Sequence, residues 1–235
     1  SHLGRGLPLG LQFSILAVGI IVMQGAVVRF DIAENGIMVP GTPAQNGFSA
    51  ANKLINFLMA LYNGLASAIL GFNAQNYGKS DYRRIRQGTR QSLIIMLIMY
   101  AFCLTAGLLL SIGGAYQHIF MSEDKISEAS VRFGNTYLYV DFILYFILGF
   151  LIVTRSAVQG ITKVGYVLGA GVAELVSRVL ICAYLPALVN GGATDASASL
   201  ASFAAVCFGD PGAWLLASLV LLVPTVKYIF RMQYK

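Results

Sequence analysis

The residues best suited to chemistry in this sequence are ionisable side chains inside long apolar stretches. Asp141 lies about six residues inside a predicted helix over 135–154, or about 9 Å from its nearer end. A carboxylate is expensive in hydrocarbon and by default marks an ion or substrate site. Asp141 is therefore a candidate proton or cation site. The alternative is an interfacial acid that reaches lipid headgroups and is satisfied by Tyr137 or Tyr145.

A second candidate site is formed by Glu174 and Arg178, near the middle of a predicted helix over 165–189. Their spacing of four residues places both side chains on one helix face. One hypothesis is an acid for a substrate cation or a coupling proton, held by its arginine. We favour the alternative of an internal ion pair that fixes helix packing, because paired charges cost less in a low-dielectric interior than either charge alone.

Amide side chains form the third group of candidates. Gln24 lies on the first predicted helix, and Asn73, Gln75 and Asn76 lie near the end of the second. Such amides can line a cavity and hydrogen-bond an organic cation. They can equally join helices to one another or cap a helix end beside Gly78. For Gln75 and Asn76 we favour the structural role, whereas Gln24 and Asn73 remain candidate binding residues.

The sequence lacks the patterns of an enzyme or a metal protein. Gly47-Phe48-Ser49-Ala50 superficially resembles an intramembrane serine protease motif, but no histidine follows His118 to act as the base that a serine nucleophile needs. The cysteines are scattered and suggest neither a metal site nor a redox pair. No phosphate-binding loop is present. We therefore expect no enzyme activity, no cofactor, no bound metal and no nucleic-acid partner.

The elements that position these residues are membrane-spanning helices. Of the 235 residues, 57% are hydrophobic and only 11% are charged, whereas a soluble domain carries about 25% charged residues. Much of the surface must therefore face a lipid bilayer. Six apolar segments reach the roughly 20 residues that a spanning helix needs, and they predict an all-α membrane protein with a single transmembrane lobe over residues 1–235. The segments are approximately 7–28, 47–76, 92–112, 135–154, 165–189 and 211–230.

The segments between these helices carry further signals. The basic stretch 81–91 is predicted to lie at the membrane surface, and 122–133 is predicted to form a separate amphipathic helix. Small residues recur at helical spacing from Gly64 to Ala74, which predicts a face for close helix contact. Most basic residues fall on the side of the membrane that holds both termini, so the positive-inside rule predicts cytoplasmic termini.

Four stretches in order then resemble one family. Residues 71–88 (GFNAQNYGKSDYRRIRQG) are similar to the end of a lobe's second helix in multidrug and toxic compound extrusion (MATE) transporters. The start of helix seven in that family resembles Leu7–Gln12, and the cytoplasmic end of helix ten resembles Arg155–Gly160. Helices eleven and twelve resemble Ala173–Arg178 followed by Asp210–Trp214. The resemblance covers nearly the whole chain and implies the C-terminal six-helix lobe of a transporter with about twelve helices in two lobes.

The resemblance implies a secondary active exporter of organic cations, driven by exchange for H⁺ or Na⁺ through alternating access, in the inner membrane of a prokaryote. Its partners would be the bilayer, the N-terminal lobe and small organic cations. In NorM-type members the positions matching Leu16 and Leu148 are acidic. Their apolar character here places the chain closer to the DinF-like branch.

Two alternatives remain open. A flippase of the same superfamily would move a lipid-linked or polysaccharide substrate and would need a cationic cavity, which only Arg178, Lys53 and Arg29 are positioned to supply. The other alternative is a membrane interaction module that transports nothing.

Overall fold

The structure is a computed structural model that describes residues 2–231, apart from the side chains of residues 2–9, 12, 13 and 16. The described residues form helices and one isolated bridge between Ile32 and Met38, without any longer strand. In chain order the elements are α1 (His2–Val28), η1 (Arg29–Asp31), α2 (Pro43–Gly78), α3 (Tyr82–Ser111), η2 (Ile112–Gly114), α4 (Ala115–Phe120), η3 (Glu123–Lys125), α5 (Glu128–Gly160), α6 (Val164–Asn190), α7 (Leu200–Cys207), α8 (Gly209–Thr225) and the π-turn η4 (Val226–Phe230).

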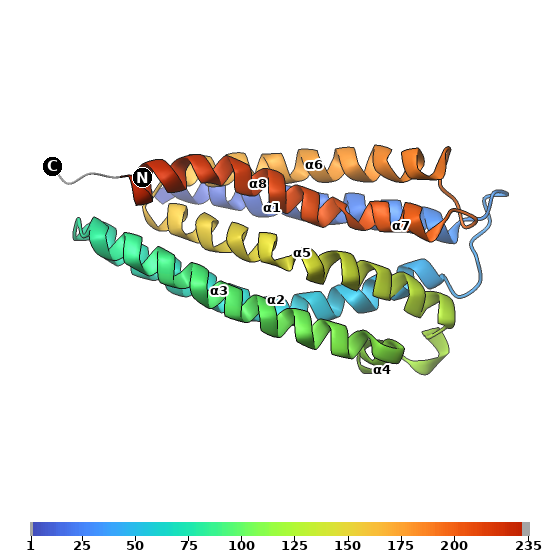
Figure 1. Cartoon of the computed structure of the whole chain (residues 1–235). Helices are drawn as coiled ribbons and strands as arrows, with labels where there is room; N and C mark the ends of the chain where they lie inside the picture. The colour runs from blue at the N-terminus through green and yellow to red at the C-terminus, as the bar shows by residue number, and fades with distance from the viewer. Residues whose placement is uncertain (1, 232–235) are drawn as a thin grey trace.

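The long helices run roughly along one direction, as a membrane bundle requires (Figure 1). Five helical stretches among the described residues are long and apolar enough to cross a membrane. The sixth long helix, α1, has 27 residues and therefore extends about 40 Å, which is also sufficient. The predicted all-α membrane bundle is confirmed. The five stretches are Pro43–Gly78, Tyr82–Phe120, Glu128–Gly160, Val164–Asn190 and Leu200–Phe230.

Helix α3 begins earlier than its apolar segment. The basic stretch 81–91 was predicted to lie at the membrane surface, but its residues form the first turns of α3. The Asp81 side chain accepts a hydrogen bond of 3.0 Å from the Arg84 amide and so caps the helix N-terminus. With this cap in place, the charged turns simply extend the helix out of the apolar region.

Helix α5 also begins earlier than predicted. Residues 122–133 do not form a separate amphipathic helix, because they divide into η3 and the first turns of α5. The start is fixed by a capping box, in which the Ser127 and Ser130 side chains each accept a hydrogen bond from the other residue's backbone amide. The result is one helix of 33 residues.

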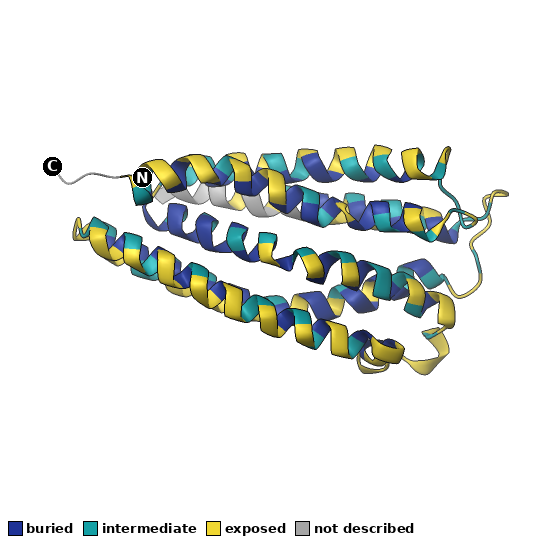
Figure 2. Cartoon of the chain, viewed as in Figure 1, coloured by how far each residue is buried: buried dark blue, intermediate teal, exposed yellow. Residues whose placement is uncertain are grey.

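Helix α5 is the centre of the bundle and contacts α2, α3, α6, α7 and α8. In Figure 1 it lies between the pair α2–α3 and the group α1, α6, α7 and α8. Its C-terminal half is almost wholly buried in Figure 2, while α3 shows a broad exposed face. The large side chains that pack around α5 include Tyr62, Phe142, Tyr145, Leu151 and Trp214. Any residue that points inward from the middle of α5 is therefore removed from both water and lipid.

Glycines allow α2 and α5 to approach closely. A Cβ atom added at Gly47 would collide with the Ser130 carbonyl oxygen and would lie 2.7 Å from the Gly134 backbone nitrogen. The predicted contact face from Gly64 to Ala74 is largely exposed in this bundle, and a Cβ atom added at Gly64 or Gly71 would meet nothing within 4 Å. Helix α2 instead buries the opposite face, which carries its large apolar side chains.

The start of α2 is held by a residue from the preceding turn. The buried carboxylate of Asp31 accepts hydrogen bonds from the backbone amides of Ala44 (2.9 Å) and Gln45 (2.8 Å). It also accepts one from the Gln45 side chain at 3.1 Å. Two of the amides that a helix N-terminus leaves without intrahelical partners are thereby satisfied. The link fixes the end of α1 to the beginning of α2.

Candidate functional site

Asp141 lies deeper in the bundle than its sequence position suggested. Because α5 begins at Glu128, the residue is thirteen positions into the helix, or about 20 Å from its start. The side chain is fully buried, and neither carboxylate oxygen has a hydrogen-bond partner within the described chain. The predicted distance of about 9 Å from the helix end is therefore wrong, because the capped start of α5 adds about two turns.

The hydroxyls that were expected to satisfy Asp141 are used elsewhere. Tyr137 donates a hydrogen bond of 2.7 Å to Asp210 on α8. Tyr145 donates one of 3.3 Å to the backbone oxygen of Ile55 on α2. The alternative of an interfacial acid satisfied by tyrosine therefore does not hold. Asp141 is a buried acid near the middle of a span.

Asp210 and Arg178 form the polar centre beside Asp141. Arg178 Nη2 donates to Asp210 Oδ1 at 2.6 Å, and both side chains are largely buried. Asp141 interacts electrostatically with both of them. Residues from α5, α6 and α8 thus converge on one cluster, which we call the Asp141 cluster: Tyr137, Asp141, Arg178 and Asp210.

Glycines in α1 and α8 make room for the arginine of this cluster. A Cβ atom added at Gly19 of α1 would lie 2.6 Å from Arg178 Nη1. One added at Gly209 of α8 would lie 2.8 Å from the Cys182 sulfur and 3.6 Å from Arg178 Cγ. The guanidinium therefore reaches Asp210 by passing between backbone segments that carry no side chain.

The charges of the cluster do not balance. Two carboxylates share one guanidinium, and that guanidinium and the Tyr137 hydroxyl both bind Asp210. Asp141 is left without a donor. An ionised carboxylate in such a place costs several kcal/mol, so a proton or a cation must neutralise it. Asp141 is therefore the acid of the cluster that has no donor among the described residues.

Glu174 has a different partner from the one its spacing predicted. It forms an ion pair with Arg155 of α5, while Arg178, four residues later, pairs with Asp210 of α8. The predicted ion pair between Glu174 and Arg178 is wrong, because each side chain finds a better-aligned partner on a neighbouring helix. Both charges still fix helix packing, which was the role favoured for them.

The two amide candidates do not join this cluster. Asn73 is buried and donates to the Thr89 hydroxyl (3.2 Å) and to the Ala157 backbone oxygen (3.4 Å), so it links α2, α3 and α5. Ala157 is sixteen residues from Asp141 on α5, a separation of about 24 Å. Gln24 is exposed on α1. The structure assigns Asn73 to helix packing and leaves Gln24 apart from the acids.

Sequence reasoning overlooked two members of these networks as candidate site residues. Asp210 and Arg155 were named only as members of the stretches that resemble the MATE family. A usable signal was present for Asp210, because it lies inside the apolar stretch Leu200–Phe230, and an acid within a span is by default functional. The described residues contain no group of three or more His, Cys, Asp or Glu able to hold a metal ion.

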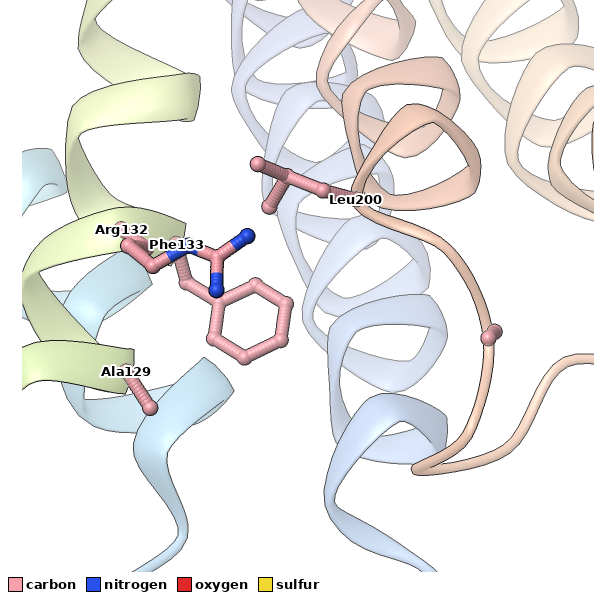
Figure 3. Close-up of a pocket in the computed structure, with 5 residues that line it drawn as sticks. Ala129, Arg132, Phe133 and Leu200 are labelled. Carbon is pink, nitrogen blue, oxygen red and sulfur yellow. The ribbon is translucent and has the colours of Figure 1, made fainter.

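A separate pocket opens near the N-terminal end of α5. It has a volume of about 150 Å³ and is lined by Ala129, Arg132, Phe133, Ala198 and Leu200. In Figure 3 the Arg132 guanidinium lies beside the Phe133 ring and extends toward α7. Arg132 is nine residues from Asp141, or about 14 Å along the helix. Its positive charge makes this pocket unsuitable for an organic cation.

These observations define the class of the protein. Apolar helices of spanning length, with buried charges at mid-span, are typical of polytopic membrane proteins that move ions or solutes. The MatE family model matches residues 38–184, which is more than half of the chain. The chain therefore belongs to the MatE family and is a membrane transporter of the MATE superfamily. No curated protein and no solved structure gives a match to the chain.

Proposed function

We propose that the chain is the C-terminal lobe of a secondary active transporter that exports organic cations in exchange for H⁺ or Na⁺. The observation that carries the proposal is the fully buried carboxyl of Asp141, which has no hydrogen-bond partner in the described chain. It lies beside an acid that Arg178 already neutralises. Such a group must bind a positive charge whenever the bundle closes around it.

Competition for this one carboxyl supports exchange. Asp210 has two donors, because Arg178 and Tyr137 both hydrogen-bond to it. Asp141 therefore holds the one negative charge of the cluster that is not compensated, and it can accept either the coupling ion or a cationic substrate. If the two cations bind alternately as the lobe faces each side of the membrane, the entry of one drives the exit of the other.

The apolar residue at position 148 also supports placing the chain in the DinF-like branch. Leu148, at a position that is acidic in the NorM-type branch, is buried among apolar residues of α5. Coupling through this lobe would then depend on Asp141. Glu174 and Arg178 act as positioning residues, because their partners lie on neighbouring helices.

The remaining features fit a lobe that works beside a second one. The exposed small-residue face of α2, with Gly64 and Gly71 free of contacts, suits close packing against an N-terminal lobe. The uneven distribution of basic residues supports cytoplasmic termini in a prokaryotic inner membrane. A flippase for phosphate-bearing lipids is less well supported, because Arg178 is paired with Asp210 and Lys53 donates to the Phe120 backbone oxygen.

The test is ion-driven export of a fluorescent organic cation in inverted membrane vesicles, using the full natural protein that contains these residues. Asp141→Asn keeps the size of the side chain and removes the ionisable group, so we expect export to fall at least about tenfold. Glu34→Gln is the matched control, because Glu34 is an exposed acid in the α1–α2 connection. Equal export by Asp141→Asn and Glu34→Gln would rule out Asp141 as the coupling site.

The two coupling ions are distinguished by the gradient that is applied. A proton gradient without sodium and a sodium gradient at equal pH are compared on the same vesicles. Export driven by either gradient, and lost in Asp141→Asn, supports exchange through this carboxyl. Uptake of a phospholipid analogue without cation export would instead favour the flippase.

A further inference from the structure

Two lysines share one aromatic ring at the end of the bundle that holds the α2–α3 turn. Lys163, in the turn between α5 and α6, has its Nζ 4.6 Å from the centroid of the Tyr228 ring. Lys227, in the π-turn after α8, has its Nζ 5.1 Å from the same centroid. Both contacts are within the range of cation–π attraction. The two ammonium groups, which carry like charges, are therefore both held at the Tyr228 ring.

The backbone conformation and the aromatic packing around the two lysines fix their positions. Thr162 adopts a left-handed conformation, with φ of 63°, which turns the chain sharply before Lys163. The Tyr166 and Tyr228 rings pack with centroids 6.1 Å apart and fix α6 against the π-turn. A hollow of about 370 Å³ lies beside them and is lined by residues 162–166. A Cβ atom added at Gly165 would meet nothing within 4 Å, so this wall of the hollow is open.

No carboxylate among the described residues balances these lysines. The three ion pairs of the described chain involve His118, Arg155 and Arg178. Asp81, the acid in the nearby α2–α3 turn, is engaged in capping α3. Two ammonium groups without an acid repel each other, and a bound anion would remove that repulsion. The arrangement is therefore suited to a negative ligand.

We propose that Lys163, Lys227, Tyr166 and Tyr228 form a binding site for the headgroup of an anionic phospholipid. The phosphate would lie between the two ammonium groups, with the tyrosines at the level of the headgroups. Exposed Val223 and Val226 continue from the site along α8 and offer an apolar path for an acyl chain. That apolar continuation is the reason to assign a lipid and not a soluble phosphate. Basic pockets of this kind on the cytoplasmic side are suited to anionic lipids.

The experiment titrates the purified protein, in neutral detergent, with phosphatidylglycerol and counts bound lipid by native mass spectrometry. Each lysine near an anionic group contributes about fivefold in affinity, so Lys163→Gln with Lys227→Gln should weaken binding roughly thirtyfold. The matched control is Lys79→Gln with Arg83→Gln, two exposed bases at the same end of the bundle. Tyr228→Leu keeps both charges and removes the ring that holds them, and it should weaken binding about fivefold.

Further arms identify the ligand and guard against misfolding. Phosphatidylcholine should bind much less than phosphatidylglycerol, and Lys163→Arg with Lys227→Arg should retain binding, because both positive charges are kept and substitution at these positions is compatible with folding. Equal loss in the two double glutamine variants would mean attraction by surface charge alone and would overturn the proposal. Displacement of the lipid by millimolar inorganic phosphate would assign the site to free phosphate and would also overturn it.

Discussion

Arg178 on α6 and Asp210 on α8 meet at 2.6 Å inside the apolar bundle, and Tyr137 on α5 donates to the same carboxylate at 2.7 Å. Three helices are thereby joined at one acid. Because Asp210 takes up both donors, its neighbour Asp141 is left without any in the described chain. The pairing that satisfies Asp210 thus leaves the Asp141 carboxyl without a hydrogen-bond donor.

Asp210→Asn is expected to destabilise the protein more than a surface change would. Removing the acid breaks the buried ion pair that Arg178 makes with Asp210, and breaking such a pair costs about 3–5 kcal/mol. Thermal unfolding in detergent, followed by circular dichroism, measures the effect. The double variant Arg178→Met with Asp210→Leu removes both charges and should recover most of that loss. A double variant that is less stable than Asp210→Asn would contradict this account of the cluster.

Gly47→Ala is expected to weaken the contact between α2 and α5. The added methyl group would collide with the Ser130 backbone, and overpacking of this kind costs about 1–3 kcal/mol. Gly64→Ala on the same helix is the matched control, because its Cβ meets nothing within 4 Å. Alanine is the better helix former, so this control should be neutral or stabilising by up to about 1 kcal/mol. Equal unfolding temperatures for the two variants would show that α2 packs differently.

Asp31→Ala is expected to loosen the start of α2. The change removes the acceptor for the amides of Ala44 and Gln45, and the loss of such a cap costs about 0.5–2 kcal/mol. Hydrogen exchange of the first turn of α2 should increase, because those amides lose their partner. Glu34→Ala, a nearby exposed acid, should leave exchange unchanged. Faster exchange in both variants would point to a general loosening of the connection and not to the cap.

The orientation of the chain can be tested by labelling single cysteines. The three native cysteines are buried, so the background with a membrane-impermeant maleimide should be low. We expect Lys79→Cys to react only from the cytoplasmic side and Glu34→Cys only from the opposite side, because basic loops remain in the cytoplasm. Labelling of right-side-out cells and inverted vesicles measures this. The reverse pattern would contradict the predicted topology.

Apolar length was enough to predict the bundle, but not the positions of polar residues within it. Ser127 and Ser130 moved the start of α5 to Glu128, and Asp141 became a mid-span residue as a result. Short polar side chains at helix starts carry no hydrophobic signal, so a search for apolar segments cannot detect them. The capping residues themselves were visible in the sequence and could have been weighed more heavily.

Pairings across helices were the other part that could not be predicted. The spacing of Glu174 and Arg178 correctly placed both on one helix, but it could not indicate that Arg155 and Asp210 lie opposite them. The small-residue face of α2 has the same limit, since periodicity defines a face without stating what covers it. The sequence shows which residues share one face of a helix, whereas the partners of those residues depend on how the helices are arranged in space.

The two ion pairs of α6 also set its register. Glu174 faces Arg155 and Arg178 faces Asp210. A slide of α6 by one helical turn of about 5.4 Å moves each residue to the place of the one four positions away. In one direction Arg178 would meet Arg155, and in the other Glu174 would meet Asp210. Either slide places like charges together, so the two ion pairs oppose a one-turn slide of α6 against α5 and α8.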